Sequence, residues 1–86
     1  MSQIRVFADF HNTDAQGHLR LNCVDTIQDL ASQNVELCNG QLLTLYNEEL
    51  EVDGVVQYSQ EENLWFAAID WNQIRQQQDL VMQVNG

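Results

Sequence analysis

The chain has 86 residues, and its thirteen Asp and Glu face only three arginines and no lysine, so the formal net charge is −10. A chain of this length forms one small hydrophobic core, so we expect a single small β-barrel domain over residues 1–86. The scarcity of basic side chains excludes a phosphate-binding face, so we expect neither nucleic acid nor an anionic membrane surface as a partner.

The sequence shows no pattern of a secretory signal or of a membrane span. The first ten residues alternate polar with apolar side chains, and no stretch approaches the ~18 consecutive apolar residues that cross a bilayer. We therefore expect a cytoplasmic protein. In a reducing compartment Cys23 and Cys38 are expected to stay free thiols, and without a second cysteine pair they do not indicate a zinc site.

Two half-buried strands are predicted first. Apolar side chains fall on alternate positions of residues 3–10 and again of residues 18–23, namely Ile4, Val6, Ala8 and Phe10, then Leu19, Leu21 and Cys23. The segment between them, residues 11–17, is rich in the Asn, Asp and Gly that favour turns. We therefore predict that the two strands form a hairpin with a longer loop.

One short helix is predicted over residues 27–33. Thr26 followed three residues later by Asp29 approximates a capping box, and Ile27 and Leu30 fall at helical spacing. Asn34 is a suitable stop.

Three further strands are predicted within residues 41–47, 50–58 and 64–70, where β-favouring and apolar residues dominate. Gly54 inside the second of these indicates a bulge or sharp bend. Residues 59–63 form a polar turn, and Asp70 is expected to cap a short helical turn that begins at Trp71. Residues 76–86 are expected to form an edge strand or a flexible tail.

Five short strands with one short helix between the second and third predict a mainly β fold, either a strongly bent sheet or an SH3-like barrel. A five-stranded OB-like barrel is the alternative. The thin stability margin of so small a core also leaves a homodimer open.

The runs LLTLYNEELEVDGVVQYSQEENLWFAAIDW and RVFADFHNTDAQGHLRL together resemble small uncharacterised bacterial proteins with an SH3-like β-barrel. The resemblance covers most of residues 4–74. It rests on hydrophobic and turn patterns with no catalytic signature, so it implies the fold and assigns no functional residue.

Both histidines lie in the segment DFHNTDAQGH, together with two acids. Asp9, His11, Asp14 and His18 carry the carboxylate and imidazole groups that bind divalent metals, and a hairpin would bring His18 back beside Asp9 and His11. A metal or small-ligand site is therefore one hypothesis. Turn formation accounts for the same residues without a ligand, and we expect no cofactor.

A second candidate site is acidic, and we expect it around the hairpin of the last two predicted strands. Its members are Glu48, Glu49, Glu51, Asp53, Glu61, Glu62 and Trp65. Such a patch suits a partner protein with a basic surface, and in SH3-like domains acids and aromatics line grooves for basic or proline-rich peptides. The simpler alternative is a solvated surface that confers solubility.

No catalytic motif accompanies these residues. G-x-S-x-G, C-x-x-C and H-E-x-x-H are all missing from the sequence. We therefore expect a non-enzymatic interaction or accessory domain that binds a basic partner.

Overall fold

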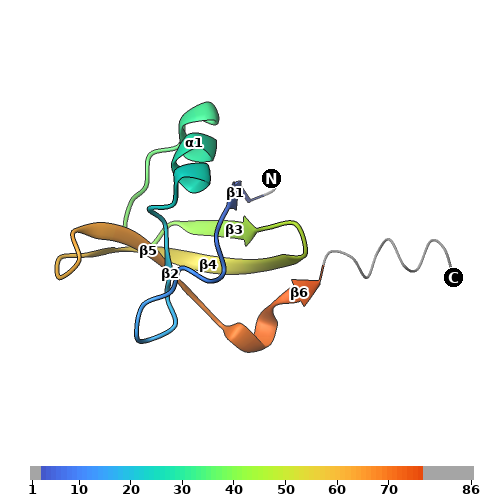
Figure 1. The fold of residues 1–86 in the computed structure, drawn as a ribbon. Coiled ribbons are helices and arrows are strands. Elements are labelled where there is room, and N and C mark those ends of the chain that lie inside the picture. The colour runs from blue at the N-terminus through green and yellow to red at the C-terminus, as the bar shows by residue number, and fades with distance from the viewer. Residues whose placement is uncertain (1–2, 77–86) are drawn as a thin grey trace, which may run out of the picture.

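The fold is given by a computed structural model, which describes residues 3–76. Its elements follow one another along the chain as β1 (Arg5–Phe7), β2 (Leu19–Arg20), α1 (Val24–Ser32), β3 (Leu42–Tyr46), β4 (Leu50–Ser59), β5 (Leu64–Ile69), the 3₁₀ turn η1 (Trp71–Gln73) and β6 (Arg75–Gln76). The predicted class is confirmed, because strands dominate and the one α-helix lies in the connection between β2 and β3 (Figure 1).

The strands form one strongly curled sheet, a half-barrel, in the order β1-β3-β4-β5-β2 (Figure 1). β3, β4 and β5 follow one another as antiparallel neighbours. β1 joins β3 in parallel, with Val6 opposite Leu45, while β2 pairs antiparallel with β5 and β6 pairs with the first residues of β4. The half-barrel agrees with the expected small β-barrel.

The predicted hairpin between the first two strands is wrong. β1 and β2 lie at opposite ends of the strand order, because β1 forms its backbone hydrogen bonds with β3. The chain still turns back locally, since the Asp14 amide donates to the His18 carbonyl at 3.0 Å and the Arg20 amide donates to the Asn12 carbonyl at 2.9 Å. Alternation along a strand reveals which face is buried, but it does not reveal the neighbouring strand.

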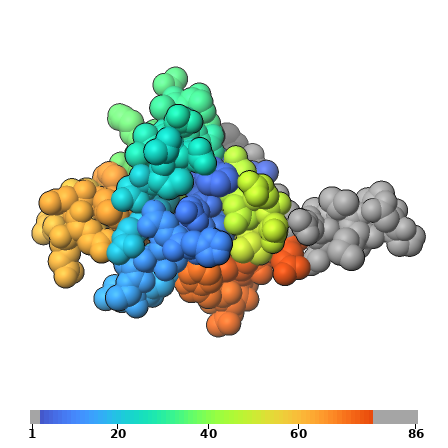
Figure 2. Space-filling model, in the orientation of Figure 1, coloured from blue at the N-terminus to red at the C-terminus, as the bar shows by residue number. Residues whose placement is uncertain are grey.

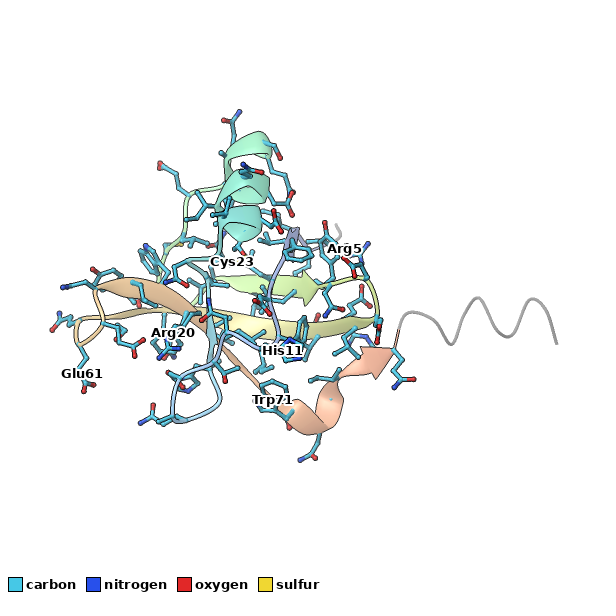
Figure 3. The ribbon with its side chains drawn as sticks, in the orientation of Figure 1. Arg5, His11, Arg20, Cys23, Glu61 and Trp71 are labelled. Atoms are coloured by element: carbon cyan, nitrogen blue, oxygen red, sulfur yellow. The ribbon has the colours of Figure 1, made fainter. Side chains whose placement is uncertain are left out.

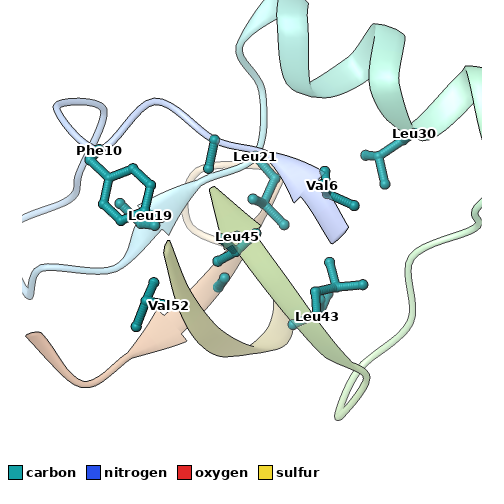
Figure 4. Close-up of a cluster of buried hydrophobic side chains, with 11 residues drawn as sticks. Val6, Phe10, Leu19, Leu21, Leu30, Leu43, Leu45 and Val52 are labelled. Atoms are coloured by element: carbon teal, nitrogen blue, oxygen red, sulfur yellow. The ribbon is translucent and has the colours of Figure 1, made fainter. Parts of the chain in front are cut away.

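The concave side of the sheet holds the core. Most of the alternating residues predicted to point inward are buried there, but Ile4 is exposed and Cys23 is only half-buried. Leu30 of α1 joins the core, whose members are Val6, Ala8, Phe10, Leu19, Leu21, Leu30, Leu43, Leu45, Val52, Val56 and Ala67 (Figure 4). Gly54 is buried among them without a bulge, since the pairing of β3 with β4 runs through it in continuous register. Its role is to leave space for the side chains around it.

The helix begins three residues earlier than predicted, after Cys23, which is extended and makes no side-chain capping hydrogen bond. Thr26 is therefore a helical residue and is fully buried, while Ile27 is exposed. Asp29 does not form a capping box but accepts a hydrogen bond from the Phe7 amide at 2.8 Å. Packing of Leu30 into the core sets the rotation of the helix about its axis, which turns Thr26 inward and Ile27 outward (Figure 4).

Asp70 caps η1 as predicted, since its carboxylate accepts the Asn72 amide at 2.9 Å. The predicted edge strand or tail of residues 76–86 begins with β6, and its remainder lies outside the described residues. Cys23 and Cys38 are both free thiols. None of the helices within residues 3–76 has the length and apolarity that crossing a membrane requires.

Candidate functional site

The predicted acidic residues do not gather at one hairpin. Glu48 and Glu49 lie in the turn before β4, whereas Glu61 and Glu62 lie in the turn after it. The ten residues of β4 separate the two turns by roughly 30 Å, at about 3.3 Å per residue. The structure therefore divides the predicted patch between two ends of the sheet.

The two acids at the start of β4 are engaged within the chain. Glu51 forms ion pairs with Arg5 at 3.0 Å and with Arg75 at 3.3 Å. Asp53 lies 3.5 Å from Arg75 and accepts a hydrogen bond from the Thr44 hydroxyl at 3.1 Å. These two carboxylates therefore link β1, β3, β4 and β6 to one another.

The other end of the sheet carries a groove of about 650 Å³. One wall is the turn of residues 14–18, the other is the turn between β4 and β5, and Phe66 of β5 lies between them. Figure 2 shows these two segments, blue and orange, which are distant in sequence but project from the same side of the molecule. We call this hollow the 14–62 groove.

The first wall contains a fixed carboxylate–imidazole pair. Asp14 accepts the backbone amides of Gln16 at 2.8 Å and His18 at 2.9 Å, and its other oxygen lies 3.0 Å from Nδ1 of His18. Burial alone would raise the pKa of Asp14, but these hydrogen bonds outweigh it and the pKa is lowered. The imidazole stacks on Phe66 with ring centroids 4.5 Å apart, which leaves a flat aromatic pair beside a carboxylate.

The second wall carries two glutamates with different surroundings. Glu62 binds Arg20 in bidentate fashion, with N–O distances of 2.9 and 2.8 Å, and this lowers the pKa of Glu62 while raising that of Arg20. Arg20 also donates to the Thr13 carbonyl at 2.7 Å, so it ties the two walls together. Glu61 is exposed at the outer end of the turn, directed toward solvent (Figure 3).

A hydrogen bond from η1 holds the first wall in place. Gly17 has a φ of +84°, and its carbonyl accepts the indole N–H of Trp71 at 2.8 Å. A side chain at residue 17 would meet Trp71 at 3.0 Å, so only glycine fits this contact without strain. Trp71 is thus a positioning residue for the turn that carries Asp14 and His18.

The four predicted metal ligands separate into two pairs. Asp14 contacts His18 as described, whereas Asp9 lies 3.6 Å from a His11 whose side chain is 99% exposed. A smaller hollow of about 260 Å³ adjoins Asp9, His11 and Cys23. In the part of the chain that the structure describes, His, Cys, Asp and Glu form no group of three or more that could hold a metal ion. Metal binding stays a prediction of the sequence.

Trp65 and its neighbour Phe66 occupy opposite faces of β5. Trp65 packs against the core and meets Tyr58 edge-on, with centroids 5.1 Å apart, whereas Phe66 lines the groove. Trp65 was predicted from the sequence as a site residue, whereas Phe66 and Gln16 were not. Alternation in β5 does place Phe66 opposite to Trp65, but its contact with His18 requires the pairing of β2 with β5, which the sequence did not reveal.

Comparison of the chain with protein-family models, with characterised proteins and with solved structures finds no match. A function is therefore inferred from the geometry and charge of the 14–62 groove.

Proposed function

We propose that this protein is a non-enzymatic interaction domain whose 14–62 groove binds a basic, extended segment of a partner protein. The observation that carries the proposal is the composition of the groove, in which Asp14, Glu61 and Glu62 surround the stacked rings of His18 and Phe66. An arginine or lysine side chain gains from carboxylates by charge-assisted hydrogen bonds and from an aromatic face by a cation–π contact.

The charge of the whole chain supports the same partner. Each of the three arginines already pairs with an acid, so the surplus of carboxylates is not neutralised from within. The resulting negative field attracts a basic partner and raises the rate of encounter, an effect that weakens as salt is added.

The ion pair of Arg20 with Glu62 shows how a guanidinium fits this wall. Both oxygens of Glu62 accept from Arg20 in the planar arrangement that arginine favours. Glu61 is the adjacent residue on the same turn and is exposed, so it is the carboxylate that an incoming arginine meets first.

The test is a calorimetric titration of the full chain with a short arginine–glycine peptide at low salt. Glu61→Gln should weaken binding by about 1 kcal/mol, roughly fivefold in Kd, because it removes one contacting carboxylate. Glu49→Gln is the matched control, since it makes the same charge change in an exposed turn at the other end of β4. It should alter Kd much less, because only the long-range field changes.

Two results would contradict the proposal. The peptide could fail to bind the unchanged protein at low salt, or the two variants could weaken binding equally. Equal weakening would mean that the affinity for the peptide depends on net charge and not on contacts in the groove.

A further inference from the structure

Within residues 3–76, β1 is the last strand at its end of the sheet, so one of its edges faces away from the other strands. The Ile4 carbonyl and the Ala8 amide form hydrogen bonds with β3, at 2.9 Å each. Because backbone groups alternate in direction along a strand, those of Arg5 and Phe7 point away from β3. This edge has the geometry at which a further strand could pair.

The side chains of Asp29 in α1 and of Gln33, the residue that caps the end of α1, occupy that edge. The carboxylate of Asp29 accepts the Phe7 amide at 2.8 Å, and the side-chain amide of Gln33 donates to the Arg5 carbonyl at 2.7 Å. Gln33 also donates to Asp29 at 3.1 Å, so the two side chains support one another one helical turn apart. Together they supply one acceptor and one donor, as a neighbouring strand would.

The helix contributes little else to the fold. Only Thr26 and Leu30 among its nine residues are buried, and the hydroxyl of Thr26 lies in the interior without a hydrogen-bond partner. In Figure 1 the helix stands beside β1 at the end of the sheet. Asp29 and Gln33 provide two hydrogen bonds to the β1 edge, and Asp29 accepts a third from the Tyr46 hydroxyl of β3 at 3.4 Å.

We infer that Asp29 and Gln33 block strand pairing at the edge of β1, and that the partner they exclude is β1 of a second copy of this chain. In an antiparallel pair centred on Val6, the Phe7 amide of each copy faces the Arg5 carbonyl of the other. These are the two groups that the helix now holds, so the edge is complementary to itself under two-fold symmetry. The two side chains thereby keep two copies of the chain from pairing through β1.

The net charge of −10 acts in the same direction, because two copies repel one another. Salt screens this repulsion, since the Debye length falls from about 10 Å at 0.1 M to about 3 Å at 1 M. A β1 edge without these two side chains should therefore pair more readily as the salt concentration rises.

The test compares the mass in solution of the unchanged protein, of Asp29→Ala/Gln33→Ala, and of the control Asp25→Ala/Gln28→Ala by light scattering at low and high salt. The control removes the same residue types from exposed positions of the same helix. We expect a doubled mass for the first variant at high salt, and a single-chain mass for the other two proteins. In a mixture of isotope-labelled and unlabelled variant, intermolecular NOEs should join Arg5 of one copy to Phe7 of the other.

The inference is overturned if the folded Asp29→Ala/Gln33→Ala variant keeps the single-chain mass at every salt concentration, if the control doubles its mass equally, or if the NOEs place the contact elsewhere. Pairing of the unchanged protein through β1 would overturn it as well. Should the double variant unfold, Gln33→Ala alone decides the question, because it frees the Arg5 carbonyl from an exposed position and leaves the core intact. Dimers of that variant at high salt then support the inference that Asp29 and Gln33 block pairing through β1, and a single-chain mass refutes it.

Discussion

Replacing Gly54 by alanine should destabilise the protein through steric crowding alone. A Cβ at this position would lie 3.0 Å from Cγ2 of Ile69, 3.0 Å from Cδ1 of Leu45 and 3.2 Å from Cβ of Ala67. Leu45 and Ala67 are fully buried, so they have little room to move away. Overpacking of this kind costs about 1–3 kcal/mol, and the lower entropy of the unfolded chain offsets about 0.4–1 kcal/mol. We expect a net loss of about 1–2 kcal/mol.

For a domain of this size, that loss lowers Tm by roughly 4–15 °C. The assay is thermal and urea unfolding followed by circular dichroism. Gly40→Ala is the control, because nothing lies within 4 Å of its Cβ position and its φ is +86°, so any loss there comes from the backbone.

A double-mutant cycle identifies the cause. Ile69→Ala removes one of the crowding atoms, so Gly54→Ala should cost less in that background, by at least about 0.5 kcal/mol. Gly40→Ala should show no such coupling. Steric crowding is refuted as the cause if Gly54→Ala leaves the free energy of unfolding unchanged, or if its effect adds to that of Ile69→Ala without coupling.

Four further substitutions test other features of the fold. Thr26→Val should stabilise the protein by about 1 kcal/mol in urea unfolding, because it removes a buried hydroxyl without a partner; a loss of stability would show that the hydroxyl is satisfied in solution. Because the pKa of Asp14 is lowered by folding, its contribution to stability is present above pH 4 and is lost as the pH falls through the lowered pKa. Asp14→Asn should therefore reduce the urea midpoint at pH 7, and the difference from the unchanged protein should shrink at pH 2; a constant difference would refute the assignment. Trp71→Phe should cost about 0.5–1.5 kcal/mol through the lost hydrogen bond to Gly17, and Gly17→Ala should cost more, because the residue also has a positive φ; the reverse order in thermal unfolding would contradict the proposed contact.

The candidate site was only partly predictable. The sequence identified Asp14, His18, Glu61 and Glu62, but it assigned them to two unrelated sites. They belong to one groove because β2 pairs with β5, which brings the 14–18 turn beside the turn that follows β4. Glu51 and Asp53 were predicted to be available to a partner, and only the folded chain places Arg5 and Arg75 against them.

The sequence by itself determined the local features of this protein. Alternation of apolar residues predicted β1, β2 and β4, and a high content of apolar and β-favouring residues predicted β3 and β5. Turn chemistry predicted the stop at Asn34 and the cap at Asp70. These features depend on neighbouring residues, whose spacing is written directly in the chain. The tertiary structure decided the partners of the strands, the rotation of α1 and the groove. Such contacts join residues far apart in sequence, and the energy of packing and of paired charges selects among the many pairings that the same local pattern permits.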